Sequence, residues 1–377
     1  MKRPCLQLLR EWPPGFGGIE RVAHELASNW QRPVYSLDAQ PQRRNLPDSL
    51  PVAYPRQRLP RLQLGRLLLP RPSLQLRKLL FSSEPLHGHL PSPGVLLILV
   101  VARLLQPKRW VSVHWHAFLE RSPGCSGILF GLYQWLALRL IPWFSVVVTT
   151  SPALAAELLR CGCHSARLKV LPCCLDAELE RSALALPLRM HEAEAPLRVL
   201  FIGRLDSYKR LDLLLQALAA VEGEWCLQVV GDGPRRVAFE KFSQQLFHGD
   251  HRVQFLGCVD EQIKLCCLEW ADVLVLPSDR SNEAFGIVQL EAMAAGIPSL
   301  AFQRQRSGMG WVGQLAGMTW SQQPKDLAFV LQRLLSDKDL LMQLDKQSRA
   351  RYNALFSRAI WTHQFQDIGP EQSYGGS

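Results

Sequence analysis

Several features that would place a protein in a familiar class are missing from this chain of 377 residues. The longest apolar run, Val95–Leu105, is too short to span a bilayer and contains Arg103. The N-terminal sequence MKRPCLQLLREWPP has a basic start but no apolar run of signal-peptide length. We therefore expect a cytoplasmic protein, either free or peripheral on the inner face of a membrane.

A disulfide or metal framework is also missing, although the chain has 10 cysteines. Cys173–Cys174 and Cys266–Cys267 are adjacent pairs, and Cys161-x-Cys163 is not a usual zinc spacing. This pattern predicts reduced thiols in a cytosol and no metal site. With 47% hydrophobic residues the chain can form a sizeable core, so the composition is not that of a disordered protein.

Acidic residues are absent from residues 56–81, a segment with interleaved leucines in a chain of net charge +10. Such a charge suggests an anionic partner, and Arg56–Lys78 is a candidate for lying on an anionic membrane surface. The alternative is a solvated helix and loop that pack their leucines on the core. Three prolines at positions 60, 70 and 72 exclude one long helix. Nucleic acid is not expected as a partner, because the segment lacks an aromatic stacking pattern.

Alternating strand-like and helix-like segments predict two α/β domains, the natural number for this length. Residues 176–196 are polar and rich in alanine and indicate the domain boundary. Short apolar runs predict strands at 5–9, 33–37, 52–54, 86–90, 110–115, 145–149 and 169–173, then at 198–202, 226–230, 253–256, 273–276 and 299–302. We expect two facing, Rossmann-like doubly wound domains, with ligands in the cleft at the carboxyl ends of strands.

A glycine-containing loop, Trp12–Gly18, separates the first predicted strand from the helix expected at Ile19–Trp30. Strand, glycine loop and helix is an arrangement that holds phosphate, because glycine lets the backbone approach an anion closely. A tight turn without a ligand explains the same residues. The residues of this loop alone fit a phosphate-binding loop and a turn without a ligand equally well.

Four features of the second half follow consecutive strands and should therefore share one rim of the sheet. Arg204 and Lys209 follow its first strand, where they can hold a diphosphate. The second strand is followed by glycines at 231 and 233, and the third by Gly257–Val259. The stretch Glu283–Gly296 follows the fourth.

Glu283–Gly296, reading EAFGIVQLEAMAAG, is the most informative stretch. We expect Phe285, Gly286, Ile287 and Val288 to form the first turn of a helix, whose free N–H groups attract phosphate. Glu291 would lie about two turns into that helix, at 3.6 residues per turn, and reach ribose hydroxyls. An ordinary strand–loop–helix unit of an α/β core is the alternative interpretation.

These motifs together resemble the retaining glycosyltransferases of family 4, which have a GT-B fold. The similarity is carried by GGIERVAHELA, GRLDSYKR, GDGP and EAFGIVQLEAMAAGIP, and by HLPSP and VHWHAFLER in the first half. It covers nearly the whole chain. It implies an acceptor-binding domain at residues 1–176, a linker at 177–196, a nucleotide-sugar-binding domain at 197–350, and a closing helix and tail at 351–377 that cross back to the first domain.

The resemblance also implies roles for individual residues. Arg204 and Lys209 would hold the donor phosphates, Glu283 would contact the sugar and Glu291 the ribose. The catalytic set would then be His116, Arg204, Lys209 and Glu283, with His114 as the alternative histidine. The donor-binding residues would be Gly18, Gly231, Gly233, Val259, Phe285, Gly286, Ile287, Val288 and Glu291.

Two departures from the family pattern affect these assignments. Phe118 stands where an acidic residue often follows the histidine, and the sequence after Pro298 lacks the usual glycine pair, proline and glutamate. The implied reaction moves a hexose from a nucleotide-diphosphate sugar to a glycan or lipid-linked acceptor, in polysaccharide or cell-envelope biosynthesis. It would proceed with retention and without a metal or other cofactor. The alternative is a non-catalytic protein that binds a nucleotide sugar or glycan on the same scaffold.

Overall fold

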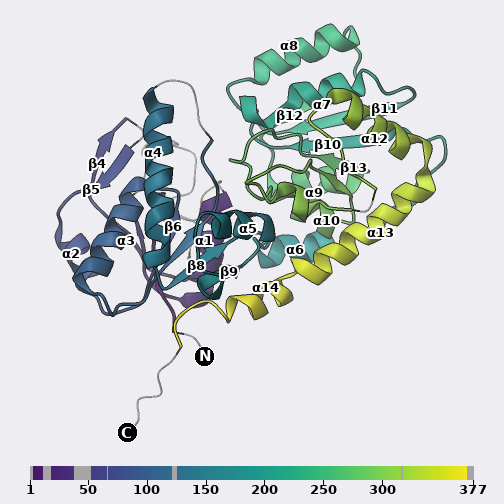
Figure 1. Ribbon diagram of the computed structural model, residues 1–377. Helices are drawn as coiled ribbons and strands as arrows, with labels where there is room; N and C mark the ends of the chain where they lie inside the picture. Colours follow the sequence, from purple (N-terminus) through teal and green to yellow (C-terminus); the bar gives the residue numbers. More distant parts are fainter. Residues whose placement is uncertain are drawn as a thin grey trace. The chain divides into compact units, whose positions relative to one another are not determined.

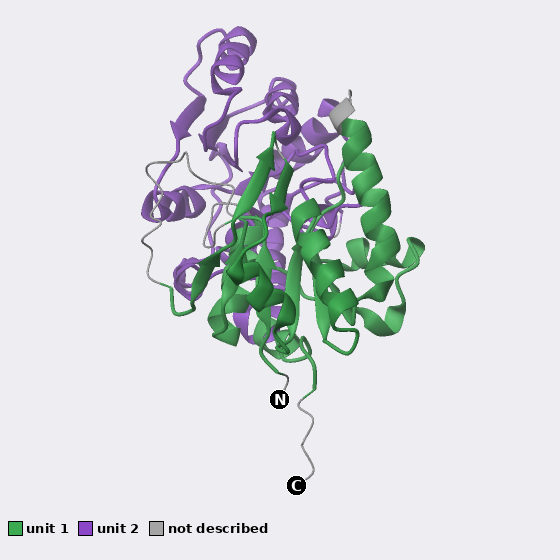
Figure 2. Cartoon of the chain, turned by 90° about the vertical axis from the view of Figure 1, so that its left-hand side faces the viewer, with its two compact units in different colours: residues 1–173, 361–377 green, residues 174–360 purple. Residues whose placement is uncertain are grey.

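The computed structural model describes residues 3–11, 18–37, 52–65, 67–120, 125–315 and 317–371. The chain divides into two compact units, one formed by residues 1–173 and 361–377 and the other by residues 174–360 (Figure 2). Each unit contains its own parallel sheet with helices around it (Figure 1).

The first unit contains a sheet of seven parallel strands in the order β3-β2-β1-β6-β7-β8-β9. Several of its strands are buried along their whole length, as expected of a sheet covered by helices on both faces. The strands are β1 (Leu6–Leu9), β2 (Val34–Ser36), β3 (Arg56–Arg58), β6 (Leu86–Leu90), β7 (Val111–Trp115), β8 (Val146–Thr149) and β9 (Leu168–Val170). The helices are α1 (Gly18–Trp30), α2 (Leu74–Phe81), α3 (Pro93–Leu105), α4 (Cys125–Leu140) and α5 (Pro152–Arg160).

Local helix signals in the first unit act as the sequence predicts. Ser151 caps α5 through its side-chain oxygen, which accepts the Leu154 N–H at 3.2 Å, and Pro152 occupies the first helical position. The apolar run Val95–Leu105 is part of α3, and its inner face is buried in the unit. Within the described ranges, no helix is both long and apolar enough to cross a membrane.

The basic segment Arg56–Lys78 forms a strand, a hairpin and most of a helix, rather than only a helix and a loop. The strand predicted at 52–54 is wrong, because β3 forms later, at Arg56–Arg58. An antiparallel hairpin follows, with β4 (Arg61–Leu64) paired to β5 (Leu67–Pro70), and then α2. Gly65 adopts φ +59° between the hairpin strands, a conformation that glycine takes without steric cost.

The second unit contains a sheet of five parallel strands in the order β12-β11-β10-β13-β14. They are β10 (Leu197–Ile202), β11 (Trp225–Val230), β12 (Val253–Gly257), β13 (Val273–Val275) and β14 (Ser299–Leu300). The α-helices of this part of the chain are α6 (Ala177–Ala185), α7 (Leu211–Leu218), α8 (Arg236–Phe247), α9 (Glu261–Trp270), α10 (Val288–Ala294), α11 (Met309–Val312), α12 (Pro324–Ser336), α13 (Lys338–Leu355) and the start of α14 (Arg358–Phe365).

The domain boundary lies slightly earlier than the sequence suggests. The second unit begins at Cys174, so the residues assigned to a linker, 177–196, belong to it. Within them α6 forms and contacts α10, with Leu179 and Ala183 buried. The polar composition of this segment reflects the exposed face of α6. The last residues, from Trp361, group with the first unit, where Phe365 contacts Trp30.

The strand order reverses beside the first strand of each sheet. In the second unit the chain runs from β10 outward to β11 and β12, then crosses to β13 on the other side of β10. In the first unit it runs from β1 to β2 and β3, then crosses to β6. Ligands in open parallel sheets bind outside the carboxyl ends of strands at such switch points. Most of the predicted site residues lie near these two points, either in loops that follow strands or in the first turn of a helix.

Candidate active site

Two loops meet at the switch point of the second unit, and they bring Lys209 and Glu283 together. Lys209 ends a short 3-10 helix, Ser207–Lys209, after β10, and Glu283 lies in the loop after β13. The Lys209 Nζ donates to a carboxylate oxygen of Glu283, which also lies 3.5 Å from the Ser278 Oγ. Both side chains of the pair are largely buried. A cation and an anion therefore stand side by side where the fold binds ligands.

Burial and charge act in opposite directions on Lys209. Desolvation alone lowers the pKa of this amine, but the carboxylate of Glu283 outweighs it, so its pKa is raised. Lys209 is therefore cationic at neutral pH. Burial also raises the pKa of Tyr208, which keeps this phenol neutral.

Hydrogen bonds hold the two loops in place. The Asp279 N–H donates to the Tyr208 carbonyl at 3.0 Å, and Arg210 donates to the Asp279 carboxylate at 3.0 Å. The segment after Pro298, where the sequence departs from the family pattern, is part of this arrangement. Its Gly308 N–H donates to the Ala284 carbonyl at 2.7 Å, so it supports the backbone beside Glu283.

The glycines after β11 allow neighbouring loops to approach one another. Gly231 has φ +127°, and a Cβ at this position would lie 2.0 Å from the Gly203 carbonyl oxygen. A Cβ on Gly233 would lie 2.4 Å from the Leu205 carbonyl oxygen. The loops after β10 and β11 are thus packed backbone to backbone. The close packing of these two loops requires glycine at both positions, whether or not either glycine contacts a donor.

The helix that carries Glu291 begins later than predicted. α10 starts at Val288, so Phe285 and Gly286 precede it and Glu291 lies in its first turn, not two turns in. The reason is local, because Gly286 adopts φ +73°, which is incompatible with a helical turn. Phe285 is buried and packs edge-on against Trp311 and Phe356. The N–H groups of residues 285–288 nevertheless have no backbone acceptor among the described residues.

Glu291 is buried, and it forms an ion pair that the sequence does not reveal. Its carboxylate lies 3.0 Å from the Nζ of Lys264 on α9, and Lys264 also lies 2.7 Å from Glu261. The pair joins two helices of the unit. Glu291 is therefore held in one position by a cation before any ligand is considered.

Arg204 and Val259 lie nearer the surface. The side chain of Arg204 is 58% exposed and its Nε lies 3.9 Å from the Asp206 carboxylate, a separation that allows only a weak exposed ion pair. Its guanidinium is therefore available to an incoming anion. Val259 is half-buried, two residues after β12 ends.

In the first unit, His116 follows the end of β7 and takes part in a chain of buried hydrogen bonds. Its Nε2 lies 2.9 Å from His89 Nδ1, and His89 Nε2 lies 2.8 Å from the Oε1 of Gln7 on β1. His114, inside β7, stacks on His116 with 4.1 Å between ring centroids. Burial, reinforced by the neighbouring histidines, lowers the pKa of His116 and of His114 well below the usual range, so both are neutral.

The two remaining first-unit positions have simple structural explanations. Phe118 is fully buried and packs against Trp115, so the side chain that replaces the family's acid belongs to the core. Gly18 begins α1, and a Cβ built on it would meet no atom of the described residues within 4 Å. The rest of the predicted glycine loop, Trp12 to Gly17, lies outside the described residues.

Comparison with known proteins decides the family. The model for Glycosyltransferase Family 4 matches residues 16–179, and the model for Glycosyl transferases group 1 matches residues 190–351. The chain belongs to glycosyltransferase family 4 and has the GT-B fold. The resemblance drawn from its motifs is confirmed.

Several individual proteins are similar to this glycosyltransferase. It is 26% identical to D-rhamnosyltransferase WbpZ of Pseudomonas aeruginosa over 289 residues, which cover 75% of this chain and 72% of the relative. HepE from Anabaena, solved with UDP, has a similar fold at a TM-score of 0.71 and 17% identity, covering 97% and 98% of the two chains. The lipopolysaccharide outer core galactosyltransferase WaaB gives a TM-score of 0.68 at 17% identity, covering 96% and 98%.

Sequence reasoning missed several side chains that contact predicted site residues of this glycosyltransferase within each unit. Lys264 lies in an ordinary amphipathic helix, and Gln7 lies in a short apolar strand, so neither carries a motif. The histidines offered a better signal. His87-Gly-His89 and His114-Trp-His116 each place two imidazoles on one face of a strand, because side chains alternate along it.

Proposed function

We propose that this glycosyltransferase moves a hexosyl group from a nucleoside-diphosphate sugar to a glycan or lipid-linked acceptor, with retention at the anomeric carbon. The observation that carries the proposal is the Lys209–Glu283 pair at the switch point of the second unit. It offers one cation for a phosphate and one carboxylate for sugar hydroxyls, side by side. HepE, whose fold is similar, was solved with UDP, which supports a nucleoside diphosphate as the donor's anionic part.

In this mechanism Lys209 and Arg204 stabilise the charge that develops on the leaving diphosphate, so the transfer step needs no metal ion. The raised pKa of Lys209 keeps the required positive charge at neutral pH. N–H groups of residues 285–288 add hydrogen bonds to the same anion. Glu283 positions the donor sugar and does not attack it, and Glu291 binds the ribose. No enzymic nucleophile is assigned.

His116 is the first-unit residue that we assign to the reaction. Its pKa is lowered, so it presents a neutral imidazole, which suits hydrogen bonding to sugar hydroxyls rather than charge stabilisation. The bond from His116 to His89, and from His89 to Gln7, fixes its ring orientation. His114 is fully buried within β7 and is the less suitable of the two.

A glycan or lipid-linked acceptor is supported by the names of the relatives, among them WaaB, a transferase of the lipopolysaccharide outer core.

A separate argument for a lipid-linked acceptor comes from the surface of helix α4. This helix carries five apolar side chains that are between 46% and 74% exposed and recur at helical spacing, so they form one apolar stripe. They are Ile128, Leu129, Leu132, Trp135 and Leu136.

Basic side chains accompany this stripe. Arg139 on α4 lies over the Trp135 ring at 5.3 Å, and α4 contacts α3, which contacts α2 with exposed Arg77 and Lys78 (Figure 1). Apolar side chains with a tryptophan and flanking cations are typical of surfaces that bind anionic membranes. We place the membrane contact at the α4 stripe, with part of the basic segment Arg56–Lys78 beside it. The enzyme would then act at the cytoplasmic face of a membrane.

A thermal-shift screen of nucleotide sugars tests the proposed donor. A ligand that binds only the folded state raises the melting temperature by mass action. We expect one nucleoside-diphosphate sugar to raise it, and to be consumed when an acceptor extract is added. Stabilisation without consumption across a broad acceptor panel would instead favour a non-catalytic nucleotide-sugar-binding protein. No response to any nucleotide sugar would contradict both.

A further inference from the structure

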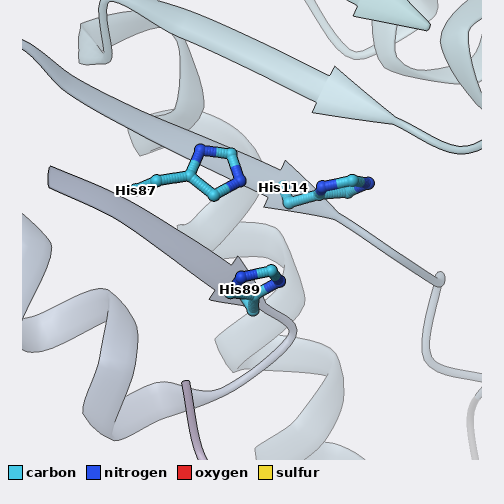
Figure 3. A group of neighbouring side chains, drawn as sticks. All are labelled: His87, His89 and His114. Carbon is cyan, nitrogen blue, oxygen red and sulfur yellow. The ribbon is translucent and has the colours of Figure 1, made fainter. Parts of the chain in front are cut away.

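Four buried histidines lie together in the first unit, on the neighbouring strands β6 and β7. Three of them, His87, His89 and His114, each have a ring nitrogen within 4.8 Å of a ring nitrogen of the other two (Figure 3). The His87 ring is nearly perpendicular to those of His89 and His114, whereas the latter two are nearly parallel. Each of the three imidazoles therefore brings one nitrogen close to a nitrogen of the other two.

Hydrogen bonds establish which nitrogen of His89 can act as a ligand. Gln7 donates its amide N–H to the Ala23 carbonyl at 3.3 Å, which turns its Oε1 toward His89. An amide oxygen only accepts, so His89 Nε2 must carry the hydrogen. The Nδ1 of His89 then has a lone pair, which in this structure faces His116 Nε2 at 2.9 Å.

The other two histidines offer lone pairs more directly. His87 Nδ1 lies 2.7 Å from the Ser112 Oγ, and its Nε2 is buried without a hydrogen-bond partner among the described residues. Both ring nitrogens of His114 are likewise buried without a hydrogen-bond partner among the described residues. Burial lowers the pKa of His87 to about 3 and that of His114 well below its usual range. These imidazoles are therefore neutral, the form that binds metals.

We propose that His87, His89 and His114 bind one zinc ion. The donor set favours a borderline transition metal over magnesium or calcium, because it consists of nitrogen atoms without a carboxylate. Ser112 and Gln7 already hold the second nitrogens of His87 and His89, an arrangement typical of ligating histidines. The ion would replace the hydrogen of His116 as the partner of His89 Nδ1. Zinc–nitrogen bonds of about 2.0–2.1 Å require the three nitrogens to move closer together.

This site is distinct from the proposed donor site. All three ligands belong to the first unit, whereas Lys209, Glu283 and Glu291 belong to the second. The ion would tie β6 to β7, whose His89 and His114 are directly paired in the sheet. Because it would take the place of the hydrogen bond between His89 and His116, the ion would act on sugar transfer only through the orientation of His116.

Zinc binding by the purified full-length protein, without an affinity tag, tests the proposal. Exposed thiols are removed first by Cys258→Ser and Cys266→Ser, because they bind zinc adventitiously. The metal-free protein is then titrated with Zn²⁺ in competition with a chromophoric chelator. We expect about one equivalent bound, with a rise in melting temperature.

Variants distinguish the site from other histidines. His114→Gln loses no hydrogen bond to any residue that the structure describes, so it should fold while weakening zinc binding by more than roughly 100-fold. Gln7→Met removes an outer partner and should weaken it by roughly 10–100-fold. His251→Ala, at an exposed histidine of the second unit, is the matched control and should bind as the parent does. Equal binding by the parent and His114→Gln, or no binding by the parent, would overturn the proposal.

Discussion

The carboxylate of Glu291 on α10 lies 3.0 Å from the Nζ of Lys264 on α9, and both side chains are buried. Glu291 is thus held in place in the first turn of α10. The N–H groups of residues 285–288, which precede and begin this helix, have no backbone acceptor among the described residues. The proposed ribose contact depends on this pair as well as on Glu291 itself.

We predict that Glu291→Gln weakens binding of the nucleotide found in the screen by roughly 10–100-fold, because a hydrogen bond to a charged group is lost. Lys264→Met should weaken it too and should destabilise the protein, since it leaves a buried carboxylate without its cation. Calorimetry and thermal melts measure both effects. In the double variant we expect stability to recover while binding does not. Wild-type affinity in Glu291→Gln would exclude the ribose contact.

Lys209→Ala should lower kcat/KM for donor consumption by about 100- to 1000-fold, because a preorganised charge opposite the leaving group is removed. The matched control is Lys241→Ala, at an exposed position on α8. Melting curves show whether the variant is folded. Activity within a factor of about three of the parent's in a folded Lys209→Ala protein would contradict the proposed role.

The two glycines of the proposed donor site should respond differently to alanine. Gly231→Ala places a Cβ 2.0 Å from a carbonyl oxygen at a φ of +127°, so we expect loss of several kcal/mol of stability or failure to fold. Gly18→Ala meets no atom of the described part of the chain within 4 Å, so we expect it to leave stability unchanged. Donor affinity should fall in Gly18→Ala only if the diphosphate approaches this backbone. Denaturant unfolding and donor titration separate the two effects.

The first unit should lose stability as the pH falls below about 6.5. His87 keeps a pKa of about 3 in the folded state, while the same group in the unfolded chain takes up a proton near 6.5. The unfolded state then binds more protons, which destabilises the fold by about 1.4 kcal/mol per pH unit for each such histidine. This stability is complete above pH 6.5 and is lost toward pH 3.

Urea unfolding at pH 7 and pH 5, with a chelator present, measures the slope. His114 also has a lowered pKa, so His114→Gln should reduce the slope by about one proton. His251→Ala, at an exposed histidine, serves as the control. The same slope in His114→Gln as in the parent would show that this group is protonated alike in both states.

Membrane binding should depend on the apolar stripe of α4. We predict that Leu132→Glu and Trp135→Glu each lower recovery on vesicles containing anionic lipid in a flotation assay. Phe329→Glu, at a residue of the second unit that is 71% exposed, tests whether any exposed apolar side chain has this effect. Equal recovery on neutral and anionic vesicles would remove the electrostatic part of the argument.

Much of the architecture could be predicted because its signals are local. The strand–helix alternation follows from residue periodicity, and the α5 cap follows from Ser151 and Pro152 alone. The predictions from sequence were wrong where tertiary packing overrides the local composition of a segment. The polar segment at 177–196 reads as a linker, yet it contains α6, because Leu179 and Ala183 suffice to pack the helix.

The sequence by itself determined the family and the order of the motifs, because these are carried by short contiguous stretches. Only the tertiary structure decided which side chains face one another. Gln7 and His89 are separated by 82 residues, and nothing in either segment indicates their hydrogen bond. Lys264–Glu291 and the His87–His89–His114 group likewise arise from packing of neighbouring elements. Partners across long sequence separations are set by how strands and helices meet, which residue periodicity does not encode.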